Sequence, residues 1–252
     1  MGMIPAYLHS LRNPALATVL ALAVWQAVVW IGDLPHFILP GPALVAEALW
    51  LNRVSIAQNA VVTIGEVLAG LVLGAVLGAA TAIQLAASPA ARAVVRPILV
   101  FTQAVPVFAL APVLVLWFGY GLWSKIAMAV LIIYFPVTSS FYDGLTRTPQ
   151  GWLDLARTMG ASPARIMWRV RVPAAIPSLA SGLRLAAVYA PIGAVIGEWV
   201  GASRGLGHLM LLANGRAKID LMFAALLVLA VFTVLLHAAV DRAARHLTER
   251  MS

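Results

Sequence analysis

The chain is 252 residues long, 62% hydrophobic and only 10% charged, with a mean hydropathy of +0.95. This composition excludes an ordinary soluble domain and predicts an integral membrane protein. The chain has no cysteine, which excludes disulfides and thiolate metal sites, and we expect its net charge of +8 to lie in loops at the membrane surface rather than to bind nucleic acid.

Apolar segments long enough to cross a bilayer recur along the chain. A spanning helix needs about 20 mainly apolar residues, and six segments meet this requirement. We therefore expect an all-α fold of six transmembrane helices in a single domain over residues 1–252. The segments are Pro14 to Ile31, Val61 to Leu85, Ile98 to Phe118, Ile126 to Tyr142, Ser178 to Val200 and Leu221 to Val240.

Small residues in the second segment predict close helix packing. Gly70, Gly74 and Gly78 repeat at every fourth position, a spacing that lets two helices approach. Glu66 lies one turn earlier on the same stripe. Because a carboxylate in hydrocarbon costs on the order of 3 kcal/mol, we expect Glu66 to face protein or water.

Glu66, together with Glu198 at the end of the fifth segment, is a candidate for the substrate pathway. The alternatives are a structural hydrogen bond for Glu66 and an interfacial or gate-supporting position for Glu198. Aromatic and polar side chains that we expect along the same pathway, with simple packing as the alternative, are Phe101, Gln103, Phe108, Tyr134 and Tyr189.

The basic residues predict the orientation of the chain, because Lys and Arg concentrate in cytoplasmic loops. With the N-terminus inside, 12 of the 17 Lys and Arg residues are cytoplasmic, so we expect both termini inside. These are Arg12, Arg92, Arg96, Arg147, Arg157, Arg165, Arg169, Arg171, Arg184, Arg242, Arg245 and Arg250. The outer residues are Arg53, Lys125, Arg204, Arg216 and Lys218.

The loop between the fourth and fifth segments contains an apolar helical face outside the membrane. Thr148 and the proline after it favour a helix start. The apolar residues that then share one face are Trp152, Leu155, Ala156 and Met159. An exposed face of this kind predicts docking into a partner's groove. The alternative is that it lies on the membrane surface while the arginines only enforce topology.

The same loop continues through a predicted turn into a basic helix. Gly160 is typical of a left-handed C-cap, and Ser162 with the following proline opens a second helix. Arg165 and Arg169 lie one turn apart on it. We expect this helix to end just before Pro173, because the residue before a proline is disfavoured in helical geometry.

The spacing in this loop resembles the cytoplasmic signature of permease subunits of bacterial ABC importers. That signature runs Glu-Ala-Ala, three residues, Gly, nine residues, Ile, any residue, Leu-Pro. Its positions are held here, with mild substitutions, by Asp154, Leu155, Ala156, Gly160, Val170, Val172 and Pro173. The stretches ILPGPALVAEAL, PVFALAPVLVLWFGYGLWSK and GEWVGASRGLGHLM look like the branch that imports sulfonates, taurine, nitrate and thiamine or riboflavin precursors.

This resemblance implies a type I ABC importer permease fold in which the loop is a coupling helix. It implies a bacterial inner-membrane location, a dimer of ATP-binding subunits, a second permease copy in a homodimer or a paralogue in its place, and an extracytoplasmic substrate-binding protein. The chain lacks a G-x-x-x-x-G-K-[ST] phosphate loop, so we expect ATP and Mg to be bound by the partner subunit and this chain to be a transport subunit, not an enzyme.

The best prediction for the substrate is the hydroxymethylpyrimidine precursor of thiamine. Two carboxylates without a basic residue at the same depth would repel a sulfonate or nitrate but accept hydrogen bonds from an aminopyrimidine. The stretch GEWVGASRGLGHLMLLANGR also resembles permeases assigned to that precursor. Sulfonate or taurine, nitrate and riboflavin remain alternatives.

Two other classes of function are kept as hypotheses. Gly201 to Gly205 reads GASRG and fits the G-x-S-x-G motif of serine hydrolases, but that motif needs a strand before the serine and an apolar helix precedes it here. An ion-coupled secondary transporter would use Glu66 and Glu198 as carriers, but the inverted repeats expected for that class are not evident.

Overall fold

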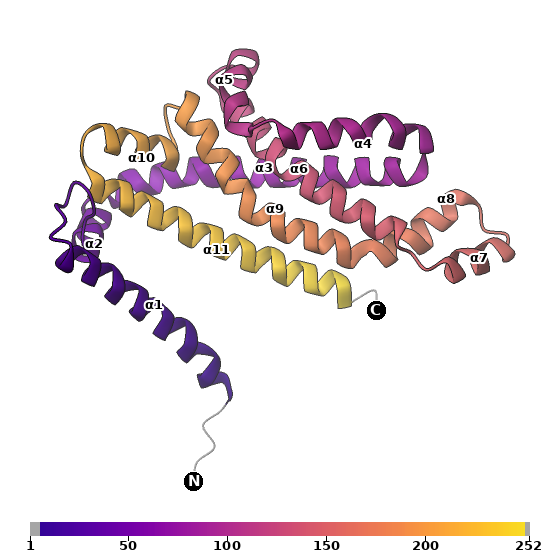
Figure 1. Cartoon of the computed structure of the whole chain (residues 1–252), viewed down its shortest axis with the longest axis horizontal. Helices are drawn as coiled ribbons and strands as arrows, with labels where there is room; N and C mark the ends of the chain where they lie inside the picture. The colour runs from indigo at the N-terminus through magenta and orange to yellow at the C-terminus, as the bar shows by residue number, and fades with distance from the viewer. Residues whose placement is uncertain (1–5, 250–252) are drawn as a thin grey trace, which may run out of the picture. The chain divides into compact units, whose positions relative to one another are not determined.

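The computed structural model describes residues 6–249, with side chains from Leu16 onward, and none of these residues forms a β-strand (Figure 1). Arg250 lies outside the described residues. The helices are α1 (Ala6–Ile31), α2 (Pro42–Leu51), α3 (Arg53–Ala87), α4 (Pro89–Ala104), α5 (Val107–Phe118), α6 (Leu122–Thr146), α7 (Gln150–Thr158), α8 (Pro163–Ile166), the π-helix η1 (Met167–Arg171), α9 (Val172–Gly201), α10 (Leu206–Gly215) and α11 (Ile219–Glu249).

Four helical stretches are long and apolar enough to cross a membrane: Arg53–Ala87, Leu122–Thr146, Pro163–Gly201 and Ile219–Glu249. They correspond to the second, fourth, fifth and sixth predicted segments. The first predicted segment falls on α1, whose part with described side chains, Leu16–Ile31, is apolar but shorter than the others. With the bent pair α4 and α5 counted as one span, the described residues give five spans instead of the six expected.

The third predicted segment is not one straight helix. Its residues are divided between α4 and α5, which are bent by 105° relative to each other. The break lies at Val105 and Pro106, where Val105 is extended with φ −86° and ψ 121°. Pro106 disfavours helical geometry at the preceding residue, so the chain turns there. Pro112, by contrast, is accommodated inside α5.

The glycine stripe of α3 packs against α6. A Cβ added to Gly70 would meet the side chain of Ala129, and one added to Gly74 would meet Ile133. Gly78 similarly lies against Val137. Since these positions are one turn apart on both helices, the two backbones approach along more than two turns, as the small-residue spacing predicts.

α6 also packs antiparallel to α9, and the two run side by side in Figure 1. Gly182 lies against Ser140 and Gly193 lies against Ala129. The core between these helices is built from small alanines of α9, including Ala186 and Ala190, which are completely buried. Small residues of α3 and α9 therefore let both helices pack closely against α6.

The chain divides into two compact units, and the features described below lie in one of them. This unit comprises Gln58–His208 with the chain from Val228 onward. The other comprises the chain up to Ala57 with Leu209–Leu227. Within the latter, Trp25 of α1 packs against Phe223 of α11 with ring centroids 5.8 Å apart.

Candidate functional site

The loop between α6 and α9 forms a short helix with an apolar face that the rest of the chain leaves exposed. Trp152, Leu155 and Met159 of α7 are 57%, 62% and 77% exposed. Leu153, between them in sequence, is buried and holds α7 to the body of the protein. Ala156 is half-buried on the exposed side. α7 is therefore anchored by Leu153 and exposes large apolar side chains on its outer face.

The end of α7 is a left-handed glycine turn. Gly160 has φ +74°, and the N–H of Ala161 donates to the carbonyl of Ala156 at 3.0 Å, the long-range bond of a Schellman motif. Ser162 then caps α8, since its Oγ accepts from the N–H of Arg165 at 3.3 Å. The left-handed glycine and the serine cap confirm the local prediction. Asp154 forms an exposed ion pair with Arg157 at 2.8 Å.

Two expectations about the ends of these helices are wrong. Thr148 does not cap α7, because its Oγ1 donates back to the carbonyl of Leu145 at 3.2 Å and the helix begins at Gln150. The second helix does not end before Pro173 but continues through η1 into α9, giving one helical stretch over Pro163–Gly201. A π-turn widens the helix where the proline ring would otherwise clash with the preceding turn.

Two clefts flank this segment. One, of about 340 Å³, is lined by Trp152 of α7, Arg169 of η1 and Pro173 of α9 among others. The second, of about 790 Å³, lies between the last turns of α3 and the turn at Gly160, and Arg157 lines it. The structure thus brings Trp152 of α7 beside Arg169 and Pro173, which lie one turn apart on the following helical stretch. Arg165 is exposed on α8.

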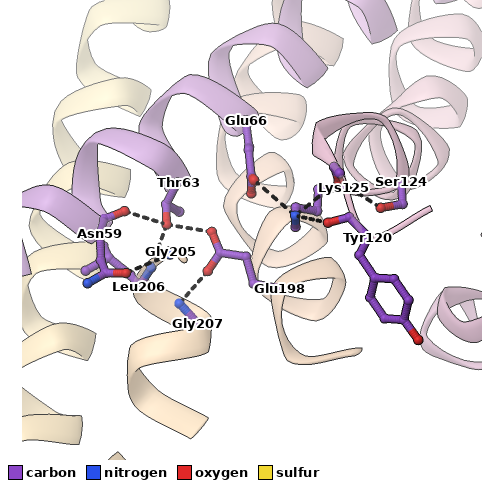
Figure 2. A network of polar contacts seen from close by, with 11 residues as sticks. Asn59, Thr63, Glu66, Tyr120, Ser124, Lys125, Glu198, Gly205, Leu206 and Gly207 are labelled. Atoms are coloured by element: carbon purple, nitrogen blue, oxygen red, sulfur yellow. Dashed lines mark hydrogen bonds and ion pairs between the residues drawn. The ribbon is translucent and has the colours of Figure 1, made fainter. Parts of the chain in front are cut away.

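The two glutamates form part of a buried polar cluster that also contains Lys125 (Figure 2). Glu66 and Glu198 are 2% and 1% exposed, and Lys125 is 6% exposed. The Nζ of Lys125 lies 3.8 Å from Oε1 of Glu66, whereas Figure 2 shows the Glu198 carboxylate turned toward Thr63 and Gly207. Nζ also donates to the carbonyls of Tyr120 and Gly121 at 3.1 Å each, in the turn before α6.

This arrangement corrects the expectation that no basic residue lies at the depth of the two carboxylates. The sequence predicts an outer-loop position for Lys125 because it precedes the apolar run, but α6 begins at Leu122 and buries it. Both glutamates are also buried within the part of the chain that the structure describes. The signal available in the sequence was the rule that intramembrane charges pair with each other.

Glu198 and Thr63 together cap α10 from outside that helix. Thr63 of α3 donates from Oγ1 to Oε1 of Glu198 at 2.6 Å. The N–H of Leu206 donates to the same Thr63 oxygen at 2.8 Å, and the N–H of Gly207 donates to Oε2 of Glu198. The first-turn N–H groups of a helix have no partner within it, and here the partners come from α3 and α9.

Glycine is required where α10 meets this cap. Gly205 has φ +119°, and a Cβ there would overlap the carboxylate of Glu198. A Cβ on Gly207 would lie 2.8 Å from Oε2 of Glu198. The N–H of Gly205 also donates to Oδ1 of Asn59 at 2.8 Å. The GASRG stretch is thus the turn between α9 and α10, with a helix before it and not the strand that a nucleophile elbow needs.

The other pathway candidates occupy different surroundings. Phe101, Gln103 and Phe108 flank the bend between α4 and α5 and are exposed. Tyr134 of α6 is half-buried, and its hydroxyl is 2.7 Å from Oγ1 of Thr81. Tyr189 of α9 is 40% exposed. The structure does not bring these five residues together into one cavity among the described clefts.

Comparison with known proteins identifies relatives over most of the chain. Residues 70–252 match the family described as "Binding-protein-dependent transport system inner membrane component". A probable ABC transporter permease protein of Haemophilus influenzae is 52% identical over 231 residues, which is 92% of this chain and 94% of the relative.

Two further relatives have named substrates. The formylaminopyrimidine transport permease protein ThiX of Halalkalibacterium halodurans is 37% identical over 78% of each chain. The riboflavin transport system permease protein RibX of Chloroflexus aurantiacus is 35% identical over 86% of this chain and 82% of the relative. Among solved structures, an inward-facing MetNI methionine ABC transporter superposes with a TM-score of 0.61 at 23% identity, covering 79% of this chain and 97% of that one.

Proposed function

Because this chain belongs to the family of binding-protein-dependent transport system inner membrane components, we propose that its importer carries a small aminopyrimidine, namely the hydroxymethylpyrimidine precursor of thiamine. The chain is a multi-pass permease subunit of an ABC importer in the inner membrane and not itself an enzyme. Permeases of this family work with an ATP-binding subunit and a substrate-binding protein.

The exposed apolar face of α7 supports the proposal that α7 and the turn after it are the coupling segment. Buried Leu153 anchors α7, and the exposed apolar side chains of this helix are Trp152, Leu155 and Met159. A groove on the ATP-binding subunit would bury these three side chains. Because η1 continues directly into α9, a displacement of the segment would move α9 as a rigid element. ATP and Mg would be held by the partner, since this chain has no phosphate loop.

A second copy of this chain completes the proposed assembly. The α4–α5 break at Val105 and Pro106 leaves backbone groups without helical partners within an apolar span. Irregular backbone at membrane depth is stable only against protein or a water-filled cavity. A homodimer with the pathway between its copies would surround the break with protein and with a water-filled cavity. The first candidates to contact substrate are then Gln103 and Phe108, which lie beside the break. Both termini would be cytoplasmic.

The choice of pyrimidine depends on the 37% identity to ThiX, whose name specifies formylaminopyrimidine. The argument from uncompensated carboxylates does not support it, because Lys125 neutralises one of them. Riboflavin is the second candidate, since RibX is 35% identical over a larger share of the chain.

The test is uptake by the complete transporter in proteoliposomes with its own binding protein and internal ATP. Labelled hydroxymethylpyrimidine should accumulate inside the proteoliposomes. Replacing the phosphate-loop lysine of the ATP-binding subunit should abolish this accumulation. Riboflavin, taurine and nitrate serve as competitors. Tight binding of riboflavin or taurine by the binding protein, with no pyrimidine uptake, would reject the proposed substrate, and uptake without the ATP-binding subunit would reject the energy source.

A further inference from the structure

One face of α4 forms an open, shallow surface separate from the coupling segment and the polar cluster. It runs from Pro89 through Arg92 and Arg96 to Val100 and Phe101. Arg92 and Arg96 are one turn apart, so their guanidinium groups share this face. The end near Pro89 is basic, and the end near Phe101 is apolar.

Arg92 is held in place by its neighbours. Its Nε donates to the carbonyl of Leu85 in the last turns of α3 at 3.3 Å. Its guanidinium lies over the ring of Tyr142, 5.8 Å from the ring centroid. These contacts use one of the five N–H donors of the side chain, and the planar group remains suited to phosphate oxygens. The arginine is therefore ordered before any ligand arrives.

The electrostatics of this face favour a net negative ligand. The sequence of α4, PAARAVVRPILVFTQA, contains no acidic residue. The aligned peptide dipoles of α4, which begins at the Ser88 cap (Ala91 N–H to Ser88 Oγ, 3.2 Å), add a partial positive charge near Arg92. A zwitterionic ligand would leave its own positive group without a partner on α4.

The apolar end matches the dimensions of one membrane leaflet. From Arg92 to Phe101 the helix rises about 14 Å. The hydrocarbon of one leaflet is about 15 Å thick. Val100 and Phe101 are 59% and 68% exposed, so an acyl chain beside them would cover apolar surface while its headgroup reached the arginines.

We propose that this face of α4 binds an anionic phospholipid, with the phosphodiester on Arg92 and Arg96 and an acyl chain along Val100 and Phe101. Three observations support this assignment. The side chain of Arg92 is held in place, α4 contains no acidic residue, and one face of the helix changes from basic to apolar along its length. Phe101 then belongs to a lipid contact and not to the substrate pathway. The proposal is independent of which solute is transported.

The experiment is native mass spectrometry of the complete transporter, permease with ATP-binding subunit, reconstituted with phosphatidylglycerol or phosphatidylcholine of identical acyl chains. Phosphatidylglycerol should remain bound to each permease copy and phosphatidylcholine should not. The amount of phosphatidylglycerol that stays bound should be lower by about tenfold or more in the variant R92Q/R96Q, because each arginine near an anionic headgroup contributes separately to the binding free energy. The matched control R242Q removes an exposed arginine of α11 and should retain the lipid as the unmodified chain does.

Two results would overturn the proposal. The first is equal retention of phosphatidylglycerol by R92Q/R96Q and the unmodified chain; if the permease copies of the variant also separate, the face belongs to a second copy. The second is displacement of the lipid by excess inorganic phosphate, which would make the site one for a soluble anion. Thermal unfolding in phosphatidylcholine checks that the variant is folded.

Discussion

The carboxylate of Glu198, at the end of α9, accepts a hydrogen bond from the backbone N–H of Gly207 at the start of α10. A carboxylate at a helix N-terminus satisfies an otherwise unpaired donor and interacts favourably with the helix dipole. Because Thr63 of α3 bonds to the same carboxylate, the cap ties α3, α9 and α10 together at one buried point.

Replacing Gly205 with alanine should disrupt this cap. The change places a Cβ against the Glu198 carboxylate and forces a left-handed φ of +119° on a non-glycine residue. We expect the free energy of unfolding to fall by about 2 kcal/mol or more. Thermal unfolding of the purified permease in detergent measures this loss of stability. The control Gly65→Ala adds a Cβ in open space on α3 and should be neutral or slightly stabilising; equal losses in the two variants would reject the cap.

Removing the Lys125 charge should be more harmful than removing it together with the Glu66 charge. Lys125→Met alone leaves the buried Glu66 carboxylate without its cation, which should cost about 3–5 kcal/mol. Adding Glu66→Gln removes that charge and should recover a large part of the loss. Unfolding of both single variants and the double variant gives the coupling energy. Additive losses would show that Lys125 and Glu66 do not interact.

Changing Leu155 to aspartate should separate the stability of the permease from its assembly. Leu155 is 62% exposed, so the isolated permease should unfold within about 0.5 kcal/mol of the unmodified chain. Co-purification with the ATP-binding subunit should be lost, because a charge would enter the proposed groove. Leu153→Asp, two positions earlier and buried, should instead destabilise the permease itself. Normal assembly of the Leu155 variant would contradict the proposed coupling role.

Gly160→Val should leave membrane insertion normal while transport and ATPase assembly fail. A β-branched residue at φ +74° costs about 1–2 kcal/mol and would unwind the turn between α7 and α8. Fractionation measures insertion, and uptake with co-purification measures function. The control Gly215→Val lies in a helix with open space around it and should preserve both. Unchanged uptake by the Gly160 variant would count against the coupling segment.

Local features of the chain were predictable because they depend on residues close in sequence. The small-residue spacing at Gly70, Gly74 and Gly78 indicated a close helix contact, and α3 makes it with α6. Gly160 and Ser162 indicated a left-handed turn and a cap, and both are present. Local rules also failed where two of them competed: Pro106 breaks its helix, whereas Pro173 is absorbed by the π-turn of η1.

The amino-acid sequence by itself determined that this protein is helical and embedded in a membrane, and where its basic loop presents an apolar face, because hydropathy, helical period and backbone preference are properties of short segments. Only the tertiary structure decided that Lys125 lies with Glu66 and that Thr63 and Glu198, 135 positions apart, jointly hold the start of α10. Such pairs form because buried charges and unpaired N–H groups must find partners in space, and which partners they find depends on how whole helices pack.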